Sequence, residues 1–177
     1  DAELGKVVAK KIGVKPVFKQ ITVAARIPEL QQGHVDVLAA SLTHNKEREA
    51  QIDFSLTTLI VGQNVLVKKS SGIADVPDLA GKRVVTVKGG TQEPNIRKAV
   101  PTATVVTFET APQAFVALQQ GKGVGFVNDS VSLARAVVQL GDKAGDYQIL
   151  PTNLSVEPLA KKKKKGEAGL KKVVDEA

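Results

Sequence analysis

The stretch RVVTVKGGTQEPNIRKAV at residues 83–100 decides the fold. Its first five residues are mainly β-branched, as in a buried strand, Gly89 and Gly90 mark a turn, and residues 92–100 have the spacing of a helix. A strand that passes through a tight turn into a helix begins a right-handed β-α-β crossover. This stretch therefore predicts an α/β protein.

The same alternation of strands and helices extends from this stretch in both directions. We predict further strands at residues 14–21, 35–40, 60–68, 105–108, 124–127 and 147–150. We predict helices from residue 2 or 3 up to Gly13, at residues 25–32, 77–79, 112–120 and 130–140, and after Gly166. The alternation indicates two α/β lobes with mainly parallel sheets flanked by helices, and chain crossings near residues 67–69 and 154–157.

The composition excludes several classes of protein. The chain has 177 residues, 42% of them hydrophobic, and no apolar run approaches the roughly 18 residues of a membrane-spanning helix. The absence of cysteine excludes disulfides and thiolate ligands, and two histidines without HExxH spacing predict neither a metal site nor a catalytic triad. Five lysines at residues 161–165 supply most of the net charge of +7, so we predict no nucleic-acid partner.

The loop at residues 40–48 leaves the carboxyl end of a predicted strand, the edge at which open α/β sheets bind ligands. Ser41 and Thr43 offer hydroxyls and Arg48 a planar guanidinium, a combination that suits a carboxylate. The alternative is a helix N-cap followed by a solvated arginine. Arg26 stands at the start of a predicted helix, where a cation opposes the helix dipole, so it either has a partner or lies exposed.

Two segments of the second half repeat this logic. Gly90, Thr91 and Gln92 lead from a strand into a helix, whose first N–H groups attract anions, although such glycine turns are also common without a ligand. Asp129 follows an apolar strand and either caps the next helix or accepts from a ligand ammonium. Together these segments would bind the carboxylate and the amine of an α-amino acid. No nucleophile is paired with a base, so we predict no catalytic residue.

Nearly the whole chain is covered by an ordered set of short motifs: RIPELQQG at 26–33, VDV at 35–37, the S-x-T…ER loop at 41–48, IDFS at 52–55, VLVKK at 65–69, DLAGK at 78–82, GGT at 89–91, ND at 128–129, LSVEP at 154–158 and KKVVDEA at 171–177. In this order the motifs resemble the bacterial extracellular solute-binding proteins for polar amino acids, the ligand-capturing components of ABC importers. The ending of the chain is most similar to the glutamate/aspartate-binding type.

The resemblance implies a two-lobed fold of the type II periplasmic-binding-protein kind, which closes on its ligand like a Venus flytrap. Lobe one would comprise residues 1–67 and 154–177, without the family's N-terminal strand, and lobe two residues 68–153. By position, Arg48 looks like the clamp for the α-carboxylate and Asp129 like the acceptor for the α-ammonium. The other contacts that the resemblance implies are Ser41 and Thr43 from lobe one and Thr91 and Gln92 from lobe two.

The resemblance also implies partners and a location. It predicts a monomer without cofactors that carries an amino acid, acidic or amide rather than basic, to the membrane permease of an ABC importer. It places the protein in the periplasm or outside the cell without insertion into the membrane, and we expect a signal peptide and further residues before Asp1. Two alternatives stay open: an enzyme on the same scaffold, similar to dehydratases or transglycosylases, and the ligand-sensing domain of a receptor.

The five lysines at residues 161–165 conflict with the core strand that the resemblance puts there. Alternate side chains of a strand point to opposite faces, so at least two ammonium groups would point inward. Burying each of them unpaired would cost several kcal/mol of folding free energy. We predict an extended strand paired in a sheet at this position. We also expect the natural protein to carry residues other than five lysines there.

Overall fold

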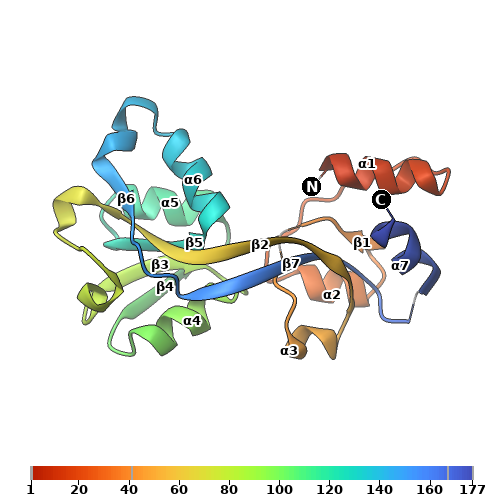
Figure 1. Ribbon diagram of the computed structural model, residues 1–177, viewed down its shortest axis with the longest axis horizontal. Coiled ribbons are helices and arrows are strands. Elements are labelled where there is room, and N and C mark those ends of the chain that lie inside the picture. Colours follow the sequence, from red (N-terminus) through yellow and green to blue (C-terminus); the bar gives the residue numbers. More distant parts are fainter. Residues whose placement is uncertain (1, 41, 167, 177) are drawn as a thin grey trace. The chain divides into compact units, whose positions relative to one another are not determined.

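The computed structural model describes residues 2–40, 42–166 and 168–176. The chain divides into two compact units: unit 1 comprises Asp1–Ile60 and Pro158–Ala177, and unit 2 comprises Val61–Glu157. Two long strands, β2 (Asp53–Lys68) and β7 (Ser155–Lys163), contribute residues to both units (Figure 1). None of the helices among the described residues is long and apolar enough to span a bilayer.

Unit 2 is built around a mixed sheet. Strand β3 (Arg83–Val87) pairs parallel with β4 (Thr104–Phe108) and with β5 (Gly125–Asp129), as the alternation of strands and helices predicts. Strand β2, however, pairs antiparallel with β5 and with β6 (Tyr147–Ile149). The α/β class is confirmed with this correction to the mainly parallel sheet, because β2 is not joined to β5 by a helical crossover and is free to run in the opposite direction.

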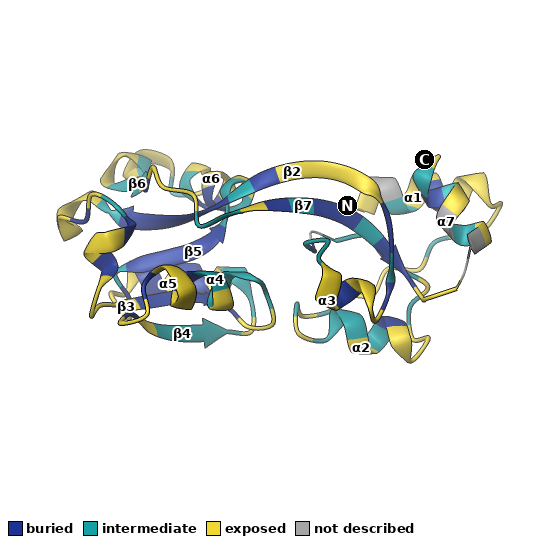
Figure 2. Cartoon of the chain, turned by 60° about the horizontal axis from the view of Figure 1, so that its bottom comes forward, coloured by how far each residue is buried: buried dark blue, intermediate teal, exposed yellow. Residues whose placement is uncertain are grey.

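Helices pack on this sheet and close the core of unit 2. They are α4 (Gln92–Ala99), α5 (Ala111–Gln119) and α6 (Ser130–Val138), with short 3₁₀ turns η1 (Lys69–Ser71), η2 (Val76–Leu79) and η3 (Gly141–Asp146). Figure 2 shows β3 and β5 as almost continuously buried. Val65, Leu79, Val84, Ile96 and Val127 are all fully buried there, which is the burial that the apolar runs of the sequence predict.

Unit 1 holds α1 (Ala2–Lys11), α2 (Arg26–Gln31), β1 (Val37–Leu38), α3 (Lys46–Glu49) and α7 (Ala168–Asp175). Strand β1 pairs antiparallel with the end of β7, Val37 opposite Lys163 and Leu38 opposite Lys162. The small hydrophobic core of unit 1 consists of Leu30, Leu38, Leu42, Ile52, Phe54 and Ala160.

The strand predicted at residues 14–21 is wrong. The structure assigns no strand to this segment, and Val17 and Phe18 are 93% and 53% exposed. An alternating pattern becomes a strand only when a neighbouring strand pairs with it, and the pairing partner of β1 in this unit is β7. The strand predicted at residues 35–40 is shorter than expected for the same reason, because only two of its residues are paired.

The strand predicted at the lysine run is confirmed for its first three residues. Strand β7 continues through Lys163, and Lys162 and Lys163 are only 1% and 2% exposed. Lys164 and Lys165 follow the strand and are exposed. Two adjacent lysine side chains, which a strand places on opposite faces, are therefore buried in unit 1.

Candidate functional site

Arg48 is held in the short helix α3 of unit 1. Its backbone N–H donates to Asn45 Oδ1 at 2.9 Å, the N-cap contact that starts the helix, and its Nη1 donates to the carbonyl of Thr43 at 3.0 Å. The side chain is only 8% exposed, which contradicts the alternative of a solvated arginine. Ser41, predicted beside it, lies outside the described residues.

The loop before Arg48 is attached to Pro158 and Leu159, where β7 enters unit 1. Thr43 forms an isolated β-bridge with Leu159, and the backbone N–H of His44 donates to the carbonyl of Pro158 at 2.8 Å. The imidazole of His44 stacks on Phe54, with 4.3 Å between the ring centroids. These contacts fix the Thr43 carbonyl that in turn orients the Arg48 guanidinium.

Four cationic side chains lie near one another in unit 1, and we call them the cation cluster: Arg26, Arg48, Lys161 and Lys162. Lys162 Nζ donates to the carbonyl of Ala40 at 2.8 Å and lies 5.9 Å from the centroid of the Phe54 ring. Burial, and then the charges of Lys161, Arg26 and Arg48, lower the pKa of Lys162 to about 6. Burial also lowers the pKa of Arg26. The structure thus brings the two predicted arginines into one strongly positive region.

In unit 2, Thr91 stands at the start of α4 but does not cap it with its side chain. Its hydroxyl donates to Glu157 Oε2 at 2.9 Å and accepts from Gln63 Nε2 at 3.1 Å. Asn95 Nδ2 completes the group by donating to Gln63 Oε1 and to Glu157 Oε1, at 2.9 and 3.2 Å. We call Gln63, Thr91, Asn95, Ser155 and Glu157 the Thr91 network.

Gln92 is placed beside Thr91 by two contacts. Its Nε2 donates to Asn128 Oδ1 at 3.1 Å, and its buried Oε1, which has no hydrogen-bond partner among the described residues, lies over Gly90. A Cβ atom added at Gly90 would be 1.8 Å from that oxygen. A larger residue at position 90 would therefore displace the Gln92 amide, although the backbone angle of Gly90 is an ordinary one.

Asp129 caps α6, the helical alternative that the sequence left open. Its Oδ1 accepts from the backbone N–H of Ser132 at 2.8 Å and its Oδ2 from the Ser132 hydroxyl at 2.7 Å. Asn128 Oδ1 accepts from the Asp129 N–H as well as from Gln92, which joins the two predicted segments of unit 2. Because two carboxylate oxygens offer about four lone pairs, this capping leaves acceptor capacity for an ammonium group.

Five polar residues of unit 2 that contact the predicted site residues or one another were missed by the sequence analysis. Ser155 and Glu157 lie in the LSVEP motif and Asn128 in the ND motif, so their positions are marked in the sequence although their roles are not. Residue type and local spacing carry no signal for Gln63 and Asn95, because their side-chain hydrogen bonds join segments distant in the sequence. The missed residues are Gln63, Asn95, Asn128, Ser155 and Glu157.

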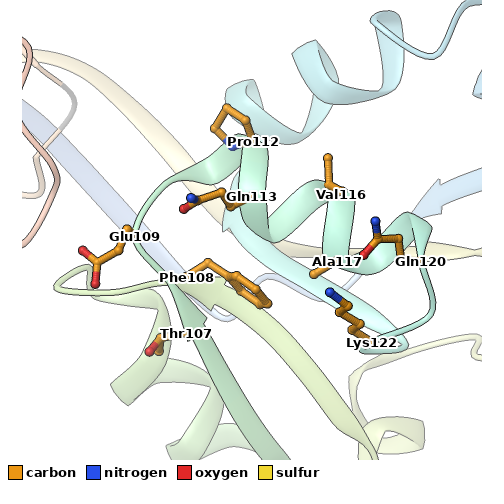
Figure 3. A pocket seen from close by; sticks show the side chains of 9 residues that line it. All are labelled: Thr107, Phe108, Glu109, Pro112, Gln113, Val116, Ala117, Gln120 and Lys122. Carbon is orange, nitrogen blue, oxygen red and sulfur yellow. The ribbon is translucent and has the colours of Figure 1, made fainter.

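A separate hollow of about 620 Å³ lies between β4 and α5 (Figure 3). No predicted site residue lines it, and its carboxylate, Glu109, is already paired with Lys88 at 3.3 Å. Within the described part of the chain, no three His, Cys, Asp or Glu residues gather in a way that would hold a metal ion. The lining residues are Thr107, Phe108, Glu109, Pro112, Gln113, Val116, Ala117, Gln120 and Lys122.

Comparison with known proteins supports the resemblance drawn from the motifs. The model of the family described as bacterial extracellular solute-binding proteins, family 3, matches residues 1–177. The chain is 36% identical over 179 residues to the ABC transporter glutamine-binding protein GlnH of Bacillus subtilis, covering 99% of this chain and 64% of that protein. It is 34% identical over 169 residues to the L-glutamate/L-aspartate-binding protein of Pseudomonas aeruginosa, covering 93% of this chain and 55% of that protein.

A solved structure gives the same result for the fold. An ancestral arginine-binding protein bound to glutamine matches with a TM-score of 0.91 at 33% identity, over 99% of this chain and 77% of that one. The predicted periplasmic-binding-protein-like fold is thereby confirmed. The chain spans less than two thirds of the length of either curated relative. All three proteins are named for amino-acid binding, which favours the binding interpretation over the enzyme alternative.

Proposed function

Because the chain belongs to family 3 of the bacterial extracellular solute-binding proteins, we propose that the protein binds one polar amino acid and delivers it to the membrane permease of an ABC importer. It does so as a monomer in the periplasm or outside the cell. Its functional lobes correspond to residues 1–67 with 154–177 and to residues 68–153. The names of the curated relatives, all of which refer to amino-acid binding, support this assignment.

The observation that carries the proposal is the buried guanidinium of Arg48, oriented by the Thr43 carbonyl at 3.0 Å within the cation cluster. A planar guanidinium pairs with a carboxylate through two parallel hydrogen bonds, and a positive surrounding strengthens that pair. Arg48 binds the α-carboxylate of the ligand, and Ser41 and Thr43 make further contacts with the ligand. Arg26, in the same cluster, adds positive charge to this end.

Unit 2 contributes groups for the rest of the ligand. Asp129, which keeps acceptor capacity after capping α6, receives the α-ammonium. Thr91 and Gln92 make the remaining contacts, and Gly90 gives Gln92 the room that its amide needs. The division of charge, cations in unit 1 and a carboxylate in unit 2, suits a zwitterion.

The side chain of the ligand is acidic or amide. The positive charges of Arg26 and Arg48 oppose a second cation on the ligand, and the two curated relatives are named for glutamine and for glutamate and aspartate. Calorimetric titration of the whole protein with glutamate, aspartate, glutamine, arginine and lysine tests this. We expect micromolar or tighter binding of one of the first three. Binding of arginine or lysine with none of the others would reverse the assignment of the ligand.

A further inference from the structure

The Thr91 network is a chain of hydrogen bonds with a single direction. Asn95 Nδ2 donates to Gln63 Oε1, which leaves the Nε2 end of the same amide facing the Thr91 hydroxyl. The Thr91 hydroxyl accepts from Gln63 and donates to Glu157 Oε2. The chain therefore begins at an amide donor and ends at a carboxylate.

Glu157 sets this direction because its carboxylate oxygens act only as acceptors in the network. The Glu157 side chain is 4% exposed, and three side chains donate to it: Thr91, Asn95 and Ser155. A buried carboxylate of this kind is stabilised by its donors, and the loss of any donor costs free energy. The Thr91 proton is therefore held on the side of Glu157.

We propose that Glu157 is a positioning residue, which holds the Thr91 hydroxyl as a hydrogen-bond acceptor toward the ligand. A hydroxyl has one proton, and in Thr91 that proton is committed to Glu157 Oε2. Toward any further partner, the Thr91 oxygen therefore acts as a hydrogen-bond acceptor. This inference rests on the proposed function and specifies the polarity of one of its contacts.

The polarity selects the part of the amino acid that Thr91 touches. An acceptor oxygen suits a ligand ammonium or amide N–H and repels a carboxylate oxygen. Thr91 thus contacts either the α-ammonium, as Asp129 does, or the side-chain amide of a glutamine ligand, while the carboxylate is left to Arg48 and to backbone N–H groups. Asn95 supports the arrangement because its hydrogen bond to Gln63 Oε1 fixes the orientation of the Gln63 amide.

A double-mutant cycle between Thr91 and Glu157 tests the proposal. The variants are Thr91→Val, which removes the hydroxyl with little change of shape, Glu157→Gln, which can donate as well as accept, and the double variant. Thr86→Val is the matched control, because Thr86 is a fully buried threonine of the same unit whose hydroxyl donates to the Val127 carbonyl at 2.9 Å, outside the network. Thr91→Ser retains a hydroxyl and serves as the rescue variant.

Affinity is measured by calorimetry with glutamate and glutamine. We expect Thr91→Val to weaken binding about tenfold and Glu157→Gln about fivefold, with Thr91→Ser within about twofold of the unmodified protein. In the Thr91→Val background Glu157→Gln should cost less than about twofold, because its effect passes through the missing hydroxyl. In the Thr86→Val background it should still cost about fivefold. An equal loss in both backgrounds would overturn the proposal.

Thermal unfolding of the same variants without ligand separates this inference from the proposed function. We expect the losses of stability of Thr91→Val and Glu157→Gln to be non-additive, and those of Thr86→Val and Glu157→Gln to add. If no amino acid binds the unmodified protein, the proposed function fails and the unfolding cycle alone decides whether Glu157 holds Thr91. Additive losses for Thr91 and Glu157 would overturn the positioning role in either case.

Discussion

The cation cluster of unit 1 and the Thr91 network of unit 2 hold their polar groups in opposite ways. In the cluster, like charges lie near one another and two of the acceptors are backbone carbonyls, those of Thr43 and Ala40. In the network, one carboxylate, Glu157, is surrounded by neutral side chains that donate to it. Unit 1 thus acts through charge, and unit 2 acts through the direction of its hydrogen bonds.

This difference has a physical consequence for how each region responds to change. A charge acts over several ångströms, so removing one member of the cluster alters the environment of all the others. A hydrogen bond depends on the positions of its donor and acceptor atoms, so a substitution in the network changes only which neighbouring groups donate and which accept. Variants of unit 1 should therefore have large effects with strong pH dependence, and variants of unit 2 smaller and more local ones.

Arg48→Ala should have the largest effect and would remove the charge-based half of the comparison. Loss of a guanidinium that pairs with a buried carboxylate costs about 2–5 kcal/mol, so binding of the amino acid should weaken at least tenfold, equivalent to about 1.4 kcal/mol. Calorimetry measures the affinity, and circular dichroism should be unchanged. Arg135→Ala, on an exposed position of α6, is the control and should bind normally. Unaltered affinity in Arg48→Ala would show that unit 1 does not act through this charge.

Lys162→Met should have the next largest effect, on stability. Burial and neighbouring charges lower the pKa of Lys162 from 10.5 to about 6 in the folded protein. Between these values the unfolded chain binds a proton that the folded protein does not, so the free energy of unfolding rises as the pH increases from about 6 toward 10.5. The methionine variant should be more stable by about 1–4 kcal/mol at pH 7, with its advantage largest near pH 6 and lost near pH 10.

Denaturant unfolding at several pH values measures this effect, and Lys164→Met, on an exposed lysine two residues further along, should change nothing. If the free energy of unfolding depends on pH in the same way in Lys162→Met and in the unmodified protein, the lowered pKa of Lys162 is contradicted. The same instability is the reason to expect other residues in the natural protein. A peptide mass spectrum that shows five lysines at residues 161–165 would refute that expectation.

Gly90→Ala should have the smallest effect on affinity and stability. It tests whether a substitution in unit 2 acts only on its immediate neighbours. The added Cβ would lie 1.8 Å from Gln92 Oε1, so the amide must swing away from Asn128. Because only the end of a flexible side chain moves, we expect a few-fold loss of affinity and a stability change below about 1 kcal/mol. Gly145→Ala, where nothing lies within 4 Å of the added atom, is the control. A loss as large as that of Arg48→Ala would show that unit 2 does not respond locally.

The parts of the fold that could be predicted from sequence are those set by near neighbours in the chain. The strand at residues 83–87 and the helix that starts at Gln92 follow from periodicity and a glycine turn, and both are confirmed. The segment at residues 14–21 has an equally good pattern but no paired neighbour in the structure, and a pattern cannot supply one. Pairing is a property of distant segments.

The candidate site divides along the same line. Arg48, Thr91 and Asp129 could be selected from sequence because their chemistry and their places at strand ends are local features. The Thr91 network could not, because its hydrogen bonds join residues 63, 91, 95, 155 and 157, which share no spacing. Nor could the direction of those bonds be inferred, since it depends on which amide atom faces which neighbour.

The exposed segment at residues 14–21 has a practical consequence for handling the isolated 177-residue chain. Val14, Val17 and Phe18 are 54%, 93% and 53% exposed on an alternating stretch whose backbone is not part of a ladder. Such a stretch is a template for a strand from another molecule, which is how many proteins aggregate. The apparent molar mass that light scattering gives for the purified chain should therefore increase with concentration. Replacing Val17 with lysine, which blocks edge-to-edge association, should raise its solubility.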